Sequence, residues 1–279
     1  MQLQRRSLVL ASASAFATTL LGGCGEGFFF VPDKLTYSTP ERLGVAAEDV
    51  FFDNGRGFRL HAWWMPAVGT PRATLVHAHG NAANLTNHAP IVRWFPAAGI
   101  NVLTFDYRGY GQSEGLPTLN GLVNDTIGAI AEARRRSAGL PLIVLGQSLG
   151  GATAVRAVAQ DNGADIRLLI VDSAFSSYRG IAHEAASHGV LSLVAPLAMP
   201  GLPSADDDPL AAIRRVRCPV LLMHGERDHV IAIQHSEMLY DAAPAGRKQF
   251  IRIPDGRHID GLTRRDIRER VFTAISAAL

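Results

Sequence analysis

Short apolar runs and longer amphipathic stretches alternate along most of the chain. The apolar runs are rich in Val, Ile and Leu and end at Gly, Pro, Asn or Asp, which is typical of strands covered on both faces of a parallel sheet. The stretches between them carry apolar residues at helical spacing. Strands are predicted to start at Ala73, Ile100, Pro141, Arg167, Pro219 and Gln249, and helices to cover residues 86–98, 120–137, 149–160, 233–243 and 264–278.

This alternation predicts an α/β fold, with a mostly parallel, twisted sheet of about eight strands and helices on both faces. Two further strand-like pieces flank Asp53-Asn54-Gly55-Arg56-Gly57, a turn sequence that predicts a hairpin. Ligands of such sheets bind beyond the carboxyl ends of the strands. Candidate functional residues are therefore expected directly after strands.

Residues 1–23 have a different pattern, in which Arg5 and Arg6 precede an apolar run and Leu21-Gly22-Gly23-Cys24. The run is shorter than the roughly 20 residues that span a bilayer as a helix, so residues 1–23 are predicted to be an export signal. The L-G-G-C sequence resembles a bacterial lipoprotein processing site, at which Cys24 becomes the lipid attachment point. The alternative is a plain secretory signal with Cys24 incidental, and either Sec or twin-arginine export fits.

The expected product is an exported protein of the cell envelope, attached to the membrane through lipid on Cys24. The whole chain has 27 basic and 25 acidic side chains. Loss of Arg5 and Arg6 with the signal leaves a balanced charge, which gives no indication of nucleic acid as a partner. Cys24 and Cys218 are the two cysteines, too few for a disulfide framework, and Cys218 is interpreted as a buried bystander.

The remaining chain divides into a tether at residues 24–45 and one domain at residues 46–279. The connection at residues 176–217 is longer than a helical crossover needs, so a small lid over the crevice is expected there. Its apolar part, residues 189–203, suits the wall of a hydrophobic substrate pocket, although ordinary packing of a crossover helix explains it nearly as well.

Ser148 lies where a predicted strand ends and a helix begins, within Gly146-Gln147-Ser148-Leu149-Gly150. This G-x-S-x-G pattern is typical of a nucleophile elbow, a strained turn in which the two glycines leave room for close approach of the chain. A serine hydroxyl needs a base to take its proton and a third group to orient that base. The pattern is short, so the interpretation depends on such partners elsewhere.

Asp228 and His258 are the predicted acid and base, because each follows a strand and the order serine, acid, histidine suits this architecture. Asp172 is the alternative acid, and His224 or His229 the alternative base. Asp106 is expected to fix the turn after its strand, and Arg108 to pair with a carboxylate. The histidines elsewhere are interpreted as structural or exposed: His61, His77, His88, His183, His188 and His235.

Attack on a carbonyl creates an oxyanion, which needs preorganised hydrogen-bond donors. The backbone N–H of Leu149, directly after the nucleophile, is the first predicted donor. The loop His79-Gly80-Asn81 follows another strand, and the backbone N–H of Asn81 is the second.

From about Leu35 onward the chain resembles the α/β-hydrolase superfamily, within it the small esterase or lysophospholipase-like branch. The matching motifs are His79-Gly80-Asn81, "DYRGYGQS" from Asp106, "GQSLG" from Gly146, "HGERD" from His224, and the late His258. The resemblance implies the same triad of Ser148, Asp228 and His258. Relatives usually have G-x-G-H at the last motif, where this chain has Asp255-Gly256-Arg257-His258, so the loop around His258 departs from the pattern.

The leading hypothesis is a serine hydrolase that cleaves carboxylic esters, with an apolar acyl group, through an acyl-enzyme. It requires neither a cofactor nor a metal. An aminopeptidase or amidase on the same scaffold is a second hypothesis, and it would need acidic or aromatic groups that capture a substrate terminus. A binding protein without catalysis, anchored in the envelope, is a third, and an intact triad disfavours it.

Overall fold

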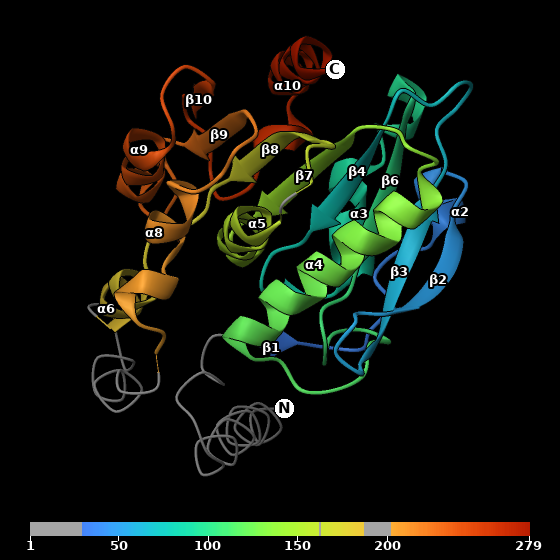
Figure 1. Ribbon diagram of the computed structural model, residues 1–279, viewed down its shortest axis with the longest axis horizontal. Helices are drawn as coiled ribbons and strands as arrows, with labels where there is room; N and C mark the ends of the chain where they lie inside the picture. The colour runs from blue at the N-terminus through green and yellow to red at the C-terminus, as the bar shows by residue number, and fades with distance from the viewer. Residues whose placement is uncertain (1–29, 162, 187–201) are drawn as a thin grey trace, which may run out of the picture.

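The computed structural model describes residues 30–161, 163–186 and 202–279 (Figure 1). Its centre is an eight-stranded sheet in the order β10-β9-β8-β7-β4-β6-β3-β2. All neighbouring strands are parallel except the pairs β2 with β3 and β3 with β6. The strands are β2 (Glu48–Asp53), β3 (Arg59–Met65), β4 (Ala73–Ala78), β6 (Ile100–Phe105), β7 (Leu142–Gln147), β8 (Ile166–Asp172), β9 (Val220–Gly225) and β10 (Lys248–Ile253).

This sheet confirms the predicted α/β fold and the predicted hairpin, whose turn joins β2 to β3. Asn54 N–H donates to the Phe58 carbonyl across that turn at 3.1 Å. The runs that begin near Ala73, Ile100, Pro141 and Arg167 form β4, β6, β7 and β8, and nearly every residue of these strands is buried. Their continuous apolar character therefore reflects burial on both faces of the sheet.

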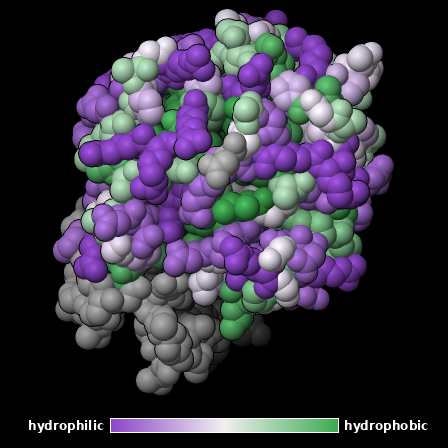
Figure 2. Space-filling view, viewed as in Figure 1, coloured by the Kyte–Doolittle hydropathy of each residue, from purple (hydrophilic) through white to green (hydrophobic). Residues whose placement is uncertain are grey.

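Helices cover both faces of the sheet. One buried apolar cluster contains residues of α4 (Leu119–Arg136), α5 (Leu149–Gln160), α8 (Pro209–Ile213) and α9 (Ile233–Ala242). The other contains residues of α3 (Leu85–Val92) and α10 (Arg265–Ala278). Trp63 and Trp64, neighbours on β3, are both buried, one in each cluster. The outer surface over α4 and α5 is mainly hydrophilic with small apolar areas (Figure 2).

The helix predicted for residues 86–98 is wrong in its second half. It ends as α3 at Val92, and a separate 3-10 turn covers Pro96–Ala98. Pro96 has no N–H to extend an α-helix, and Gly99 follows in the left-handed conformation with φ 76°. The chain then enters β6 directly.

The segment interpreted only as a tether forms regular structure. β1 (Val31–Pro32) pairs in parallel with β5 (Ala82–Ala83), and a short helix, α2 (Pro40–Leu43), follows. Asp33 N–H also donates to the Ala83 carbonyl at 3.3 Å. The N-terminal end of the described chain is thus held against the loop after β4, on the same side of the molecule as the ends of β4 and β7 (Figure 1).

Several predictions from the sequence concern residues outside the described ranges. These are the signal at residues 1–23, lipid attachment at Cys24, and most of the apolar stretch at residues 189–203. Of the expected lid, the structure describes α6 (Tyr178–Ala186), a 3-10 turn at Ala205–Asp207 and α8. In the parts of the chain described, no helix has the length and apolar character needed to cross a bilayer.

Candidate active site

The candidate site lies where the order of strands reverses. From β4 the chain passes to β6 on one side and then to β7 on the other, so the carboxyl ends of β4 and β7 flank a crevice. This switch point is where open α/β sheets bind ligands. Ser148 follows β7, and the loop beginning at His79 follows β4.

Ser148 occupies a strained turn between β7 and α5, with φ 55° and ψ −122°. A Cβ atom on Gly146 would lie 2.4 Å from the Gly150 carbonyl oxygen, and one on Gly150 would lie 2.2 Å from the Ala78 carbonyl oxygen. Neither position accommodates a side chain without a backbone shift. The two glycines of the motif therefore allow the turn that presents Ser148 at the edge of the sheet.

The structure brings Ser148, Asp228 and His258 together. His258 Nε2 lies 3.0 Å from Ser148 Oγ, and His258 Nδ1 lies 2.7 Å from Asp228 Oδ2. These contacts join positions 30 and 110 residues apart in the chain. With Nδ1–H donated to the carboxylate, Nε2 is free to accept the serine proton. The loop around His258 thus holds the imidazole between the other two residues despite Arg257 beside it.

The Asp228 side chain is fully buried and well supplied with donors. Its Oδ1 accepts hydrogen bonds from Val230 N–H at 2.8 Å and Ile231 N–H at 3.0 Å. Burial alone would raise the pKa of this carboxyl, but hydrogen bonds from His224, His258 and the Ile231 backbone hold the pKa well below its ordinary value. Asp228 is consequently a fixed negative charge at neutral pH.

The alternative acid and bases occupy other positions around the site. Asp172 accepts a hydrogen bond from Gln147 Nε2 at 2.8 Å, and burial raises the pKa of its carboxyl to about 6. His224 is buried and bonds to Ser236 Oγ and to the Ile231 carbonyl, at 2.7 and 2.9 Å, and its Nε2 also lies 3.2 Å from Asp228 Oδ2. It therefore supports the loop that carries Asp228. His229 lies on the cavity wall.

The loop after β4 passes directly beside Ser148. A Cβ atom on Gly80 would lie 3.7 Å from Ser148 Cβ and 3.2 Å from His88 Cε1, so this loop is packed closely between the two. Asn81 follows Gly80, and Leu149 is the first residue of α5, where N–H groups lack partners inside the helix. Both residues line one cavity with Ser148 and His258.

That cavity has a volume of about 900 Å³. Beyond the polar residues of the site, its wall is mainly apolar, and most of the apolar lining comes from the segments that follow β7, β8, β9 and β10. The larger apolar members are Leu149, Phe175, Ile181, Val230, Ile231 and Ile259. The described residues include no group of three or more His, Cys, Asp or Glu arranged to hold a metal ion.

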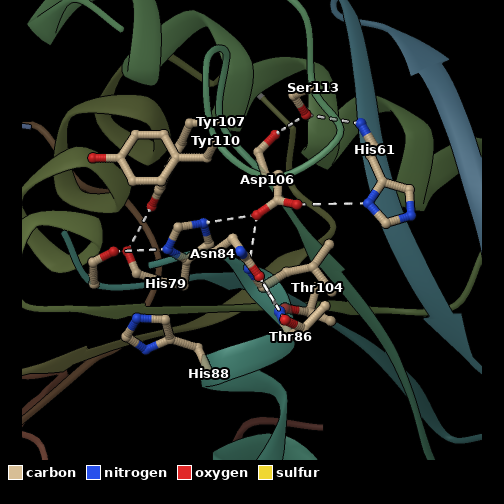
Figure 3. Close-up of polar contacts among 12 residues, drawn as sticks. His61, His79, Asn84, Thr86, His88, Thr104, Asp106, Tyr107, Tyr110 and Ser113 are labelled. Atoms are coloured by element: carbon tan, nitrogen blue, oxygen red, sulfur yellow. Dashed lines mark hydrogen bonds and ion pairs between the residues drawn. The ribbon is translucent and has the colours of Figure 1, made fainter. Parts of the chain in front are cut away.

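A buried network behind the site was only partly predicted. The Asp106 carboxylate lies between two imidazoles, 3.5 Å from His61 Nδ1 and 3.4 Å from His79 Nε2 (Figure 3). Its Oδ1 also accepts the Leu85 N–H at 2.7 Å, at the start of α3. Burial opposes ionisation of Asp106, but the bonds to His61 and His79 lower its pKa. In the sequence, this network was indicated only by the motif that begins at Asp106. That motif directly follows β6, which is a neighbour of β4 in the sheet.

Comparison with known proteins agrees with this fold. A family model described as Serine aminopeptidase, S33 matches residues 69–209 and 202–259. The uncharacterized protein YfhR of Escherichia coli O157:H7 is 39% identical over 278 residues, which cover 95% of this chain and 92% of that protein. The lysophosphatidylserine lipase ABHD12 of Danio rerio is 31% identical over 195 residues, which cover 65% of this chain and 50% of that protein.

Among solved structures, the Pyrococcus furiosus esterase Pf2001 superimposes with a TM-score of 0.72 at 19% identity, covering 88% of this chain and 98% of that one. Acetyl xylan esterase 1 from Thermoanaerobacterium superimposes with a TM-score of 0.65 at 17% identity, covering 88% and 86%. At such low identity these likenesses establish the shared fold.

Proposed function

Because the chain belongs to the serine aminopeptidase S33 family of α/β-hydrolases, we propose that it is a serine hydrolase that cleaves carboxylic esters through an acyl-enzyme on Ser148. The observation that carries this proposal is the hydrogen-bonded series Ser148 Oγ, His258 and Asp228, with distances of 3.0 and 2.7 Å. Such a series supplies a nucleophile, its base and the group that orients the base.

In the first half of the reaction, Ser148 Oγ attacks the ester carbonyl carbon while His258 Nε2 takes the hydroxyl proton. The negative charge on the carbonyl oxygen is stabilised by the backbone N–H groups of Asn81 and Leu149. His258 then gives its proton to the departing alkoxide, and the alcohol leaves. The buried carboxylate of Asp228 stabilises the imidazolium during these steps.

In the second half, a water molecule attacks the acyl group on Ser148. His258 Nε2 takes a proton from this water, and the same two N–H groups stabilise the second tetrahedral intermediate. Collapse of that intermediate breaks the bond to Ser148 Oγ, which recovers its proton from His258, and the carboxylic acid leaves.

The apolar cavity supports an ester with an apolar acyl group as the substrate. Phe175, Ile181 and Val230 are among the side chains that such a group would contact. An acyl chain gains about 0.8 kcal/mol for each methylene that it buries. The specificity constant kcat/KM should therefore rise with acyl length until the cavity is filled.

An aminopeptidase or amidase is the second candidate, because a carboxylate other than Asp228 also lines the cavity. Glu184 lines the wall, and its Oε1 lies 3.0 Å from His235 Nε2. A substrate ammonium group would compete with His235 for this carboxylate. A panel of esters of graded acyl length beside aminoacyl amides separates the two candidates by their kcat/KM values.

Replacement Ser148→Ala tests the catalytic role itself. We expect turnover to fall about a millionfold, as when a serine triad loses its nucleophile. A fluorophosphonate probe should label the parent protein and leave Ser148→Ala unlabelled. Ser137→Ala, which removes a buried hydroxyl near the C-terminal end of α4, is the matched control and should retain activity and labelling. Near-normal turnover in Ser148→Ala would refute the proposal, and a parent that resists labelling would favour a binding protein.

We further propose that the protein is exported and held at a membrane of the cell envelope by lipid on Cys24. The described chain begins at Phe30, and the next residues, Val31 and Pro32, pair with the loop beside Ser148. At roughly 3.5 Å for each residue, the chain between Cys24 and Phe30 reaches at most about 20 Å. A lipid on Cys24 would therefore keep the cavity close to the bilayer surface.

A further inference from the structure

We propose that residues 30–37, here called the strap, and the turn at residues 106–111 together form a frame that positions the backbone N–H of Asn81 for catalysis. This inference rests on the proposed function, because it gives Asn81 an oxyanion to stabilise. It also assigns a task to the turn whose sequence, Asp106-Tyr107-Arg108-Gly109-Tyr110-Gly111, has no part in the proposed chemical steps.

The strap is bound along the loop that follows β4. Val31 and Pro32 lie opposite Ala82 and Ala83 in the small parallel sheet of β1 and β5. Further along, Asn84 Nδ2 donates to the Leu35 carbonyl at 2.7 Å, and Tyr37 N–H donates to Thr86 Oγ1 at 3.0 Å. The strap therefore follows the loop from Ala82 into the first turn of α3.

The side chain of Asn81 is the point at which the strap and the turn meet. Its Oδ1 accepts hydrogen bonds from Val31 N–H at 3.1 Å and from Tyr110 OH at 2.9 Å. Tyr110 is fully buried, and burial raises the pKa of its phenol, so the hydroxyl keeps its proton. Two donors from separate segments thus converge on one oxygen of Asn81, the residue proposed to donate its backbone N–H to the oxyanion.

The turn holds the rest of the loop. Tyr107 OH donates to the His79 carbonyl at 3.0 Å, and Asp106 Oδ1 accepts the Leu85 N–H at 2.7 Å, so the loop is held at both ends (Figure 3). The turn also holds the strap, because Gly111 N–H donates to the Asp33 carbonyl at 2.9 Å. Strap, loop and turn are therefore bonded to one another in all three pairings.

The loop has a reason to need this support. Ala83 adopts φ 65°, a left-handed conformation that is unfavourable for a residue with a side chain. A donor that serves an oxyanion must also be placed accurately, since a displacement of about 1 Å can cost roughly a hundredfold in rate. External hydrogen bonds that fix Asn81 before the substrate arrives supply this preorganisation.

The first test removes one donor without touching the loop. Val31→Pro deletes the N–H that bonds to Asn81, whereas Val31→Ala keeps it and shortens a side chain that is 58% exposed. We expect kcat of the proline variant to fall about tenfold below that of the alanine variant, with KM little changed, because the loss affects the transition state more than substrate binding. Equal kcat values in the two variants would overturn the role of the strap.

The second test uses the convergence of the two bonds. Tyr110→Phe deletes the other donor, and Asn81→Ala removes the shared acceptor. In the parent protein Tyr110→Phe should lower kcat several-fold, but in the Asn81→Ala background it should lower kcat less than about twofold. If the effects of the two substitutions on kcat simply multiplied, the two side chains would act independently, which would contradict their acting through one shared hydrogen bond. Ser137→Ala controls for the loss of a buried hydroxyl, because Ser137 bonds to Thr74 at the opposite end of β4.

Two further measurements test the frame without depending on which ester is the substrate. A boronic acid that mimics the tetrahedral intermediate should lose affinity in Val31→Pro and Tyr110→Phe by the same factor as kcat/KM. Amide hydrogen exchange at residues 79–85 should be faster in both variants than in Ser137→Ala. If the parent hydrolyses no ester of the panel, the proposed function fails, and the rate of fluorophosphonate labelling then tests the frame. Unchanged labelling, boronate affinity and exchange in both variants would overturn it.

Discussion

Asp172 shows how a single buried residue supports the site at a cost in stability. Its backbone carbonyl accepts the Ser148 N–H at 2.8 Å, while its side chain is fully buried and bonded to Gln147. Removal from water raises the pKa of this carboxyl to about 6, despite the opposing effects of Gln147, His258 and His224. At neutral pH the folded protein therefore contains a carboxylate that would be more stable in water.

Asp172→Asn should stabilise the protein more at alkaline than at acidic pH. The carboxyl of an aspartate in an unfolded chain has a pKa of about 3.9. Between this pH and about 6, the native state therefore binds more protons at Asp172 than the unfolded state does. The free energy of unfolding of the parent then falls as the pH rises through this window and stays lower above it. The asparagine variant lacks this loss, and its oxygen can still accept the Gln147 bond.

Urea unfolding of both proteins at pH 4 and pH 8 measures this difference. The stability of the variant relative to the parent should increase by up to roughly 2 to 3 kcal/mol between the two pH values, since one pKa unit corresponds to about 1.4 kcal/mol. A relative stability that is the same at both pH values would show that the native carboxyl titrates like an exposed one.

At the scale of elements, one ion pair joins the turn after β6 to α4. Arg108 Nη2 lies 2.7 Å from Asp125 Oδ1, and both side chains are buried. Asp125 also accepts the Arg108 backbone N–H at 2.9 Å and Asn54 Nδ2 at 2.6 Å, the latter from the end of the β2–β3 hairpin. The expected carboxylate partner of Arg108 is thus Asp125, and it connects three elements.

Asp125→Ala should destabilise the fold strongly, because it leaves a guanidinium buried without its partner. Breaking a buried pair in this way typically costs about 3 to 5 kcal/mol. Glu269→Ala is the matched control, since Glu269 pairs with Arg265 at 2.9 Å on the exposed face of α10. Its cost should be below about 0.5 kcal/mol. Chemical denaturation of both variants tests the contrast, and similar losses would contradict it.

The elements that the sequence predicts well are those defined by local pattern. The strands β4, β6 and β7 are continuous apolar runs, and the β2–β3 hairpin contains a recognisable turn sequence between its strands. The pairing of β1 with β5 could not be predicted, because each strand has two residues and the register depends on contacts between positions 50 apart. For the same reason the partners of Asn81 and Asp106 were not visible in any local motif.

At the scale of the whole molecule, topology explains why the candidate site could be located before any geometry was known. The carboxyl ends of parallel strands share one edge, so Ser148 after β7, Asp228 after β9 and His258 after β10 had to approach one another. Sequence order favoured His258 as the base, but it left both Asp172 and Asp228 as possible acids, since both lie at the carboxyl ends of strands. Only the distances distinguish them, because the direction of each side chain depends on packing between strands.

The proposed anchor predicts a difference between two kinds of substrate. The chain between Cys24 and the strap is short, and apolar side chains are exposed both on the strap and on the cavity wall, with Leu35 66% and Val230 62% exposed. An anchored enzyme would therefore meet esters that reside in the bilayer far more often than a released one would. Soluble esters reach the cavity by diffusion in either case.

Cys24→Ser should accordingly move the protein from the membrane fraction to the soluble fraction of the cell envelope. Its kcat/KM on a soluble short-chain ester should remain that of the parent, since Cys24 is remote in sequence from every residue of the triad. Hydrolysis of a long-chain ester embedded in vesicles should be at least about tenfold slower for the variant added from solution than for the parent incorporated in the same vesicles, because the released enzyme must first bind the surface. Cys218→Ser is the control for loss of a thiol, as Cys218 lies half-buried before β9 and should leave the distribution unchanged. A Cys24→Ser protein that stays with the membrane would refute lipid at this position as the anchor.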